Sequence, residues 1–142
     1  MKPRDRGSVL FLFPVGLVIV VLLGAIAVDL GNVWLQQRRL ADAADSAAND
    51  AVAFGVDQGA LRNNGELVLD PVRVRSAVDR SVLARDLPAA TGAPSVAIGT
   101  DADGDPTIEV RLDGDVDLIF GRIVRPGGIA ITAVGVAEIV AD

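Results

Sequence analysis

"GSVLFLFPVGLVIVVLLGAIAVDLGNVWLQQRRLADAADSAAND" spans residues 7–50 and decides the fold of this 142-residue chain. No charged residue occurs from Ser8 to Val28, and a helix of that length is about 30 Å long, the hydrocarbon thickness of a bilayer. The sequence therefore predicts a transmembrane helix over residues 8–28, which follows a basic leader over residues 1–7.

The basic residues around the apolar run predict its orientation. Lys2, Arg4 and Arg6 precede the run directly, whereas Arg38 and Arg39 are the first basic residues after it. Because basic residues remain on the cytoplasmic side, we expect the leader in the cytoplasm and the rest of the chain outside the inner (cytoplasmic) membrane.

A cleaved export signal is the alternative interpretation of the same residues. Ala25 and Ala27 have the spacing of a signal peptidase site, and cleavage after Ala27 would release a secreted binding domain. Two features favour a retained anchor. The apolar run exceeds the 7–15 residues of a typical signal, and the helical pattern continues past the cleavage point.

The helix is expected to extend over residues 29–55, because strong helix formers follow Asp29 and no proline occurs there. Small apolar residues recur at helical spacing on one face, and polar residues occupy the other. The apolar face predicts close packing on a sheet or on neighbouring helices. It comprises Leu40, Ala41, Ala44, Ala47, Ala48 and Ala51, and the polar face comprises Asp42, Asp45, Ser46 and Asn49.

Three features near the end of the apolar run are candidate interface groups. Trp34 is expected to anchor the helix at the extracytoplasmic interface of the membrane that it spans, although core packing is the alternative. Asp29 either pairs with a basic group on an adjacent subunit or reaches interfacial water. Arg38 and Arg39 either contact anionic headgroups or partners, or form an exposed helix face.

Residues 56–142 are predicted to form an extracytoplasmic α+β head. Gly55, Gly59 and the cluster at 63–65 predict a loop or tight turn. Asp70-Pro71 then opens a second helix that is expected to reach about Asp86, with an Arg75–Asp79 pair on its surface. A connector over residues 88–94 follows.

Beyond the connector the hydrophobic period changes from 3.6 to 2, which predicts an antiparallel sheet of three or four strands. Val96 and Ile98 mark one strand, and residues 108–112 mark the next. The segment "VDLIFGRIV" (116–124) is expected to form one or two helical turns that place Leu118, Phe120 and Ile123 against the core. The run at 129–140 is apolar on both faces, which is typical of a central strand.

Composition argues against several classes of function. The net charge is −6 and the part after the membrane segment is acidic, which disfavours nucleic acid as a partner. The chain has no cysteine and no histidine, so thiolate metal sites and the commonest general base are absent. Neither a phosphate-binding loop nor a nucleophile–base pair can be assembled. We expect no enzyme activity, no cofactor and no small-molecule substrate.

Acidic turns are the only candidate metal ligands. Asp101, Asp103 and Asp105 supply oxygen ligands of the kind that calcium prefers, but Pro106 and Leu112 occupy positions where an EF-hand loop needs Gly and Glu. Asp113, Asp115 and Asp117 repeat the spacing. A solvated hairpin turn explains each cluster more simply than a metal site does. The alternative is that the two turns lie close together and hold one calcium ion weakly, which would give the secreted binding domain a weak calcium site.

Several stretches together resemble the TadE/TadG-like proteins of Tad (tight adherence, Flp-type) pilus systems. They are the leader ending in "RGS", the junction "AVDLGNVWLQQRRLADAADSAANDAVAFG" (27–55), and the blocks "IEVRL" (108–112), "LIFGRIV" (118–124) and "ITAVGVAEI" (131–139). The junction carries the most specific part of the resemblance, from Ala27 to Asp45.

The resemblance implies a single-pass, pilin-like envelope protein that helps to assemble a pilus or becomes a minor part of it, with other pilus components as partners. It also implies possible cleavage by a prepilin peptidase after Gly7, which would make Ser8 the new N-terminus. Such mature chains usually carry Glu at their fifth residue, and this chain has Leu12 there. The TadG-like branch, which lacks that Glu, fits better.

Overall fold

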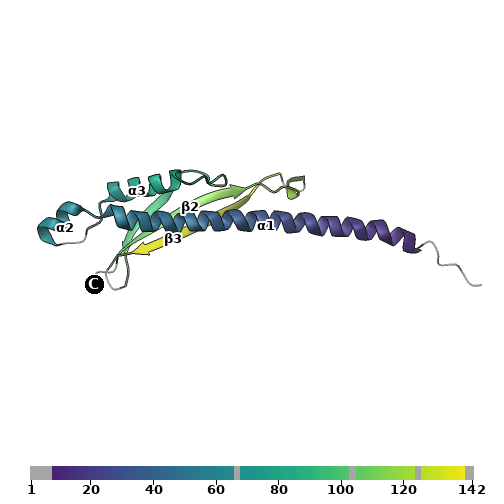
Figure 1. Cartoon of the computed structure of the whole chain (residues 1–142), viewed down its shortest axis with the longest axis horizontal. Helices are drawn as coiled ribbons and strands as arrows, with labels where there is room; N and C mark the ends of the chain where they lie inside the picture. Colours follow the sequence, from purple (N-terminus) through teal and green to yellow (C-terminus); the bar gives the residue numbers. More distant parts are fainter. Residues whose placement is uncertain (1–7, 66–67, 103–104, 124–125, 140–142) are drawn as a thin grey trace, which may run out of the picture.

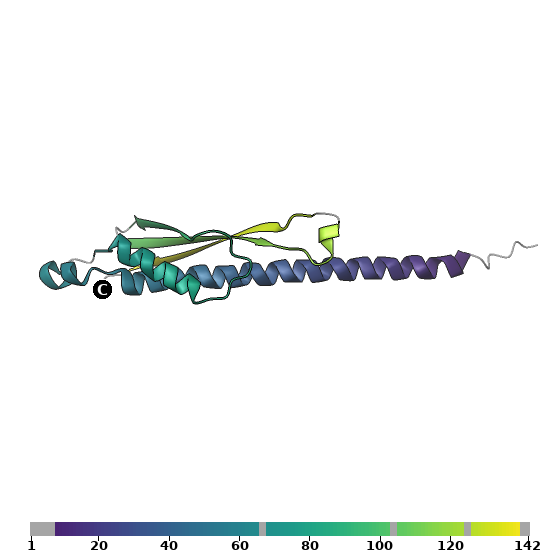
Figure 2. The same ribbon diagram turned by 90° about the horizontal axis from the view of Figure 1, so that it is seen from above.

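The computed structural model describes residues 8–65, 68–102, 105–123 and 126–139, and it confirms the α+β class. One long helix, α1 (Ser8–Gly55), runs along the whole molecule, and the remaining elements form a head beside its C-terminal half (Figure 1). The N-terminal half of α1 projects beyond the head (Figure 2).

The sequence of α1 explains why it does not break where the apolar run ends. Its only proline, Pro14, lies near its start, and neither glycine nor proline occurs from Asn32 to Phe54. Leucine, glutamine, arginine and alanine dominate this second half, and all favour helix. The 48 residues give a rod about 72 Å long, which joins the apolar run and the head in one element.

A short helix, α2 (Gln58–Asn64), follows where the sequence predicted a loop or tight turn. The Asp57 carboxylate accepts hydrogen bonds from the N–H groups of Gly59 (2.7 Å) and Ala60 (3.3 Å). Gly65 closes the helix in the left-handed region, with φ of 67°. The loop prediction was wrong because these two caps outweigh the turn propensity of glycine and asparagine.

The next helix, α3 (Pro71–Leu83), begins at the Asp70-Pro71 pair that predicted it. The Asp70 carboxylate accepts a hydrogen bond from the N–H of Val72 at 2.9 Å, and it lies 3.4 Å from the Arg73 Nε. The helix ends at Leu83, earlier than the sequence indicated. Its buried side chains are Val74, Ala77, Val78 and Ser81.

Three antiparallel strands form the sheet, in the order β1 (Ser95–Thr100), β2 (Pro106–Val116) and β3 (Ile129–Glu138). The β2–β3 register runs from Thr107 opposite Glu138 to Val116 opposite Ile129. The prediction that β3 is central was wrong, because β2 lies between the other two strands. The outer face of β3 exposes the apolar residues that suggested a central strand, Val134 and Val136.

Two layers enclose the core, with α1 and α3 side by side on one face of the sheet (Figure 2). Alternate residues of β2 and β3 point inward and pack against small residues of α1. A further turn, η1 (Gly121–Ile123), lies between β2 and β3 at the end of the head that faces the projecting half of α1 (Figures 1 and 2). The inward residues include Ile108, Val110, Leu112, Ile131, Ala133 and Ala137.

Candidate functional site at the junction of the apolar helix and the head

Asp29 is the centre of the junction between the apolar half of α1 and the head. Its carboxylate accepts three backbone hydrogen bonds from the segment that leads into η1. The donors are the N–H groups of Ile119 (2.7 Å), Phe120 (3.1 Å) and Gly121 (2.6 Å). The residue is only 7% exposed. One side chain thus satisfies three successive backbone donors and fixes the first part of the β2–β3 connection to α1.

The electrostatics of this contact favour the charged carboxylate. Burial raises the pKa of Asp29, but the hydrogen bonds from Phe120, Gly121 and Ile119 together lower it by more, so the pKa lies below its ordinary value. Asp29 is therefore expected to be a carboxylate under all physiological conditions.

Sequence reasoning missed these partners of Asp29. It offered pairing with an adjacent subunit or contact with water, whereas the structure shows an internal contact about ninety residues away in sequence. Almost every residue has a backbone N–H group, so residue types do not show which of these groups would bind Asp29, and no sequence motif could have identified them. The one available signal was an acidic residue directly after an apolar run, where a lone charge is costly.

Two more polar contacts continue along the same face of α1. The Asn32 Nδ2 donates to the carbonyl oxygen of Asp117 at 3.3 Å, and the Gln37 Nε2 donates to that of Thr132 at 3.2 Å. Asp29, Asn32 and Gln37 follow helical spacing and lead into Leu40, the first buried apolar residue of the α1 face. Polar contacts therefore join the head to α1 nearest the apolar half, and apolar packing continues beyond them.

The alanine face lies against the sheet of the same chain. Leu40 and five alanines are buried, and Ala41 is half-buried at the edge of the contact. The closest approach is at Gly135 of β3, where an added Cβ would overlap the backbone of Ala44 and Asp45. The helix backbone thus rests directly on the strand, which only small residues permit. The buried alanines are Ala43, Ala44, Ala47, Ala48 and Ala51.

The connection between β2 and β3 differs from its prediction. Leu118 is half-buried, but Phe120 is 49% exposed and Ile123 is 88% exposed, so neither of these two packs into the core. The prediction was wrong because Asp29 holds this segment by its backbone, which leaves the apolar side chains free to point outward.

Trp34 and Arg38 lie on the exposed part of α1 just beyond Asp29. Trp34 is largely exposed, and the Arg38 guanidinium carbon lies 5.7 Å from the centroid of its ring. That distance suits a cation–π contact. Arg39 is also exposed. A flat aromatic ring and cationic groups thus stand on the helix surface directly after the apolar half.

The proposed processing points lie at or within α1. Ser8 is its first residue, Gly7 lies outside the described residues, and Ala27 lies in a continuous stretch of helix. Every contact between α1 and the head described above involves residues after Ala27, so cleavage there would leave these contacts intact.

The acidic turns form local hydrogen bonds. The Asp101 carboxylate accepts from the N–H of Asp105 at 2.8 Å, while Asp103 lies outside the described residues. Asp113 accepts from the Thr132 hydroxyl at 2.7 Å, and this bond is the main reason that its pKa is lowered. Within the described ranges, no three acidic side chains are grouped as ligands for a metal ion.

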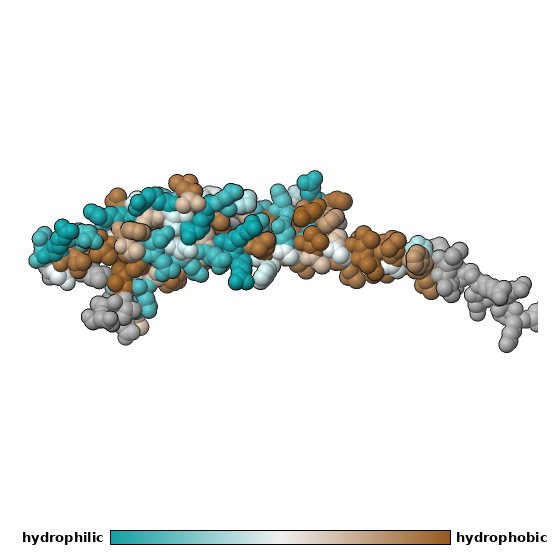
Figure 3. All heavy atoms as spheres, viewed as in Figure 1, coloured by the Kyte–Doolittle hydropathy of each residue, from teal (hydrophilic) through white to brown (hydrophobic). Residues whose placement is uncertain are grey.

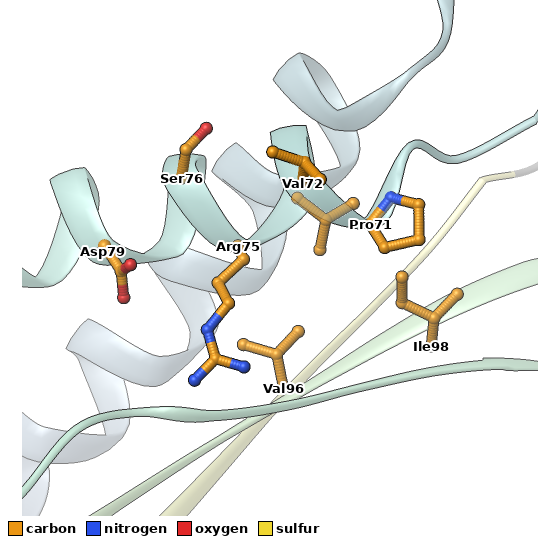
Figure 4. Close-up of a pocket in the computed structure, with 8 residues that line it drawn as sticks. Pro71, Val72, Arg75, Ser76, Asp79, Val96 and Ile98 are labelled. Carbon is orange, nitrogen blue, oxygen red and sulfur yellow. The ribbon is translucent and has the colours of Figure 1, made fainter.

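A groove of about 490 Å³ separates α3 from β1 (Figure 4). Val72, Val96 and Ile98 give it apolar walls, and the exposed Arg75 and Asp79 are among its polar groups. The predicted Arg75–Asp79 ion pair does not form, since Arg73–Asp70 and Arg111–Asp113 are the salt bridges found within the described part of the chain.

Replacing Asp29 by asparagine is expected to loosen the segment that leads into η1. Asparagine retains one acceptor oxygen and no charge, so the three N–H donors lose a charge-assisted partner. We expect the amide protons of Ile119, Phe120 and Gly121 to exchange at least tenfold faster in detergent micelles, as measured by NMR hydrogen exchange. Asp117→Asn is the matched control, because α1 contacts that residue through its backbone oxygen. Equal exchange in wild type and Asp29→Asn would contradict the role of the carboxylate.

Acidification is expected to weaken the same contact. Because the pKa of Asp29 is lower in the folded chain, its contribution to stability is complete above the unfolded value of about 3.9 and is lost as the pH falls through the folded value. The amide proton shifts of residues 119–121 should therefore titrate together, with a midpoint below 3.9. A midpoint above that value would show that burial outweighs the hydrogen bonds.

The chain was compared with protein families, curated proteins and solved structures. Residues 7–53 match the family model described as putative Flp pilus-assembly TadE/G-like, whereas no curated protein and no solved structure matches the chain. The matched stretch contains the apolar run, Asp29 and the alanine face, which are the parts of α1 that build the junction. The match confirms the resemblance of residues 7–53 to TadE/G-like proteins of Flp pilus assembly.

Proposed function

We propose that the chain is a single-pass membrane protein that acts as a structural or accessory component in the assembly of a Flp (Tad) type pilus. The apolar half of α1 is the anchor in the cytoplasmic membrane, the leader is cytoplasmic, and the head lies outside. The role is mechanical rather than catalytic, and it involves no cofactor, nucleic acid or small-molecule substrate. Its partners are the lipid bilayer and other pilus or envelope proteins.

The observation that carries this proposal is the bare apolar half of α1. From Leu12 to Val28, large apolar side chains stand exposed on every side of the helix, and Figure 3 shows them as a continuous hydrophobic rod beyond the head. A soluble protein rarely exposes so much contiguous apolar surface, and hydrocarbon is the environment that suits it. By length and composition α1 is able to cross a membrane.

The junction gives the anchor a mechanical consequence. Because α1 is one continuous helix and the head is joined to it from Asp29 onward, the head would be held in a fixed orientation, close to the outer face of the cytoplasmic membrane. Gly16 and Gly24 meet no other side chain along the projecting half, so a second helix could approach α1 closely there. Such helix packing within the bilayer would join this chain to other pilus components.

A secreted binding domain is the second candidate. The position of Ala27 favours it, because a chain cut after this residue keeps the Asp29 contacts, the alanine face and the sheet. The released protein would retain the whole head and lose the leader and the apolar half of α1.

The intact mass and N-terminal residue of the protein from its native membrane fraction distinguish these functions. We expect a chain that begins at residue 1 or 2 and remains in the membrane after carbonate extraction. A start at Ser8 would support pilin-type processing and incorporation into the pilus. A soluble chain that begins at Val28 or Asp29 would contradict the anchored role and establish the secreted domain.

A further inference from the structure

We propose that the segment around η1 is a second membrane contact, which inserts Ile119, Phe120 and Ile123 into the interfacial region of the outer leaflet beside α1. The inference rests on the proposed function, since it takes residues 8–28 as the membrane anchor. It assigns a partner, the lipid surface, to apolar side chains that the core does not use.

The position of this segment along α1 is fixed by Asp29. The carboxylate binds the N–H groups of residues 119–121, and Asp29 is the first residue after the uncharged run. Whatever depth the end of that run takes in a bilayer, η1 takes nearly the same depth. Figures 1 and 2 agree that η1 is at the end of the head nearest the projecting half of α1.

The side chains on this segment are suited to the interface. Ile119 is 56% exposed, Phe120 is 49% exposed and Ile123 is 88% exposed, although all are apolar. The exposed Arg122 stands among them and is able to reach headgroup phosphates while its aliphatic stem stays near the acyl chains. Apolar side chains with an adjacent cation are typical of segments that lie in the headgroup region.

The arrangement around the helix favours lipid over a protein partner. Successive residues on a helix point about 100° apart, so Leu30 faces a different direction from Asp29 and η1. Leu30 and Trp34, one turn apart, are both exposed on that other side of α1. Apolar groups therefore surround the helix at one level on more than one side. A bilayer interface meets a helix from all sides at one depth, whereas a single docked partner covers one side.

The absence of cysteine from the chain permits a direct test. Single variants Ile123→Cys, Val136→Cys and Leu22→Cys of the full chain are labelled with a nitroxide and reconstituted in vesicles of phosphatidylethanolamine and phosphatidylglycerol. Accessibility to oxygen, which concentrates in lipid, is compared with accessibility to a water-soluble nickel complex. Val136 is the matched control, because it is an exposed apolar residue on the outer face of β3, towards the opposite end of the head.

We expect the oxygen-to-nickel accessibility ratio at position 123 to be several-fold higher than at position 136 and to approach the ratio at position 22. Equal ratios at 123 and 136 would overturn the inference while leaving the anchor intact. Low accessibility to both reagents at 123, with spin–spin broadening, would show that a second copy covers the surface and would also overturn it. A water-accessible label at position 22 would instead refute the anchor and the proposed function.

Discussion

Replacing Gly135 by valine is expected to separate α1 from the sheet and to lower the stability of the head by about 3 kcal/mol, the upper end of the usual range for an overfilled core. A Cβ at this position overlaps the backbone of Ala44 and Asp45, and backbone atoms cannot move aside as a flexible side chain can. The loss should appear as a lower thermal midpoint in detergent micelles, followed by circular dichroism.

Strand propensity makes this substitution a sharp test. Valine favours strands more than glycine does. If local strand propensity alone determined the stability of the head, Gly135→Val would therefore increase it. The matched control is Ala130→Val, which adds a β-branched side chain at an exposed position of the same strand. We expect Ala130→Val to change the midpoint little. A stabilised Gly135→Val protein would show that the close approach of α1 to β3 is not required.

Replacing Ala44 by glutamate is expected to cost about 3 kcal/mol or more, because a carboxylate would enter the contact between α1 and the sheet without a partner. Ala44 is fully buried, and the backbone of β3 at Gly135 leaves no room for a longer side chain. Because about 1.4 kcal/mol corresponds to a factor of ten in an equilibrium constant, the amides of β3 that exchange through unfolding of the head should exchange about a hundredfold faster. Mass spectrometry of β3 peptides measures that exchange.

Asn49→Glu is the control for this variant. It places the same side chain on α1 a little over one turn away, on the face that is exposed. We expect its β3 peptides to remain as protected as those of the wild type. If both variants exchanged alike, the effect of Ala44→Glu would come from helix propensity or charge and not from packing against β3.

The long helix and the class of the head were predictable because they depend on local patterns. An uncharged apolar run, a stretch without glycine or proline, and an alanine face opposite a polar face all specify helix residue by residue. The Asp70-Pro71 pair likewise predicted the start of α3, since capping is local chemistry. Alternation of apolar residues at 108–112 predicted β2 for the same reason.

The rest depended on long-range contacts that residue types do not reveal. Val134 and Val136 made β3 appear fully apolar, yet their face of the sheet is uncovered, so strand order could not be derived from hydropathy. Phe120 and Ile123 suggested core packing for the same reason. The partners of Asp29 are backbone groups, which every sequence contains, so only the tertiary structure could identify them.

Two of the failed predictions concern apolar side chains that the head leaves exposed. Apolar residues of the η1 segment and of β3 are exposed in the isolated chain, although hydrophobic burial usually covers such side chains. In the function proposed here, a chain held at a membrane surface with neighbours in a pilus would have partners for both, and the bilayer is the one that we propose for the η1 segment.

Labelling of an exposed head position in intact spheroplasts tests the central claim most directly. Leu83, at the end of α3, is largely exposed, and the chain has no cysteine of its own. We expect a Leu83→Cys variant to react with a membrane-impermeant maleimide in intact spheroplasts, while the full-length labelled chain stays in the carbonate-washed membrane. Labelling that requires lysis would place the head inside, and a labelled chain in the soluble fraction would show that the apolar half of α1 is not an anchor.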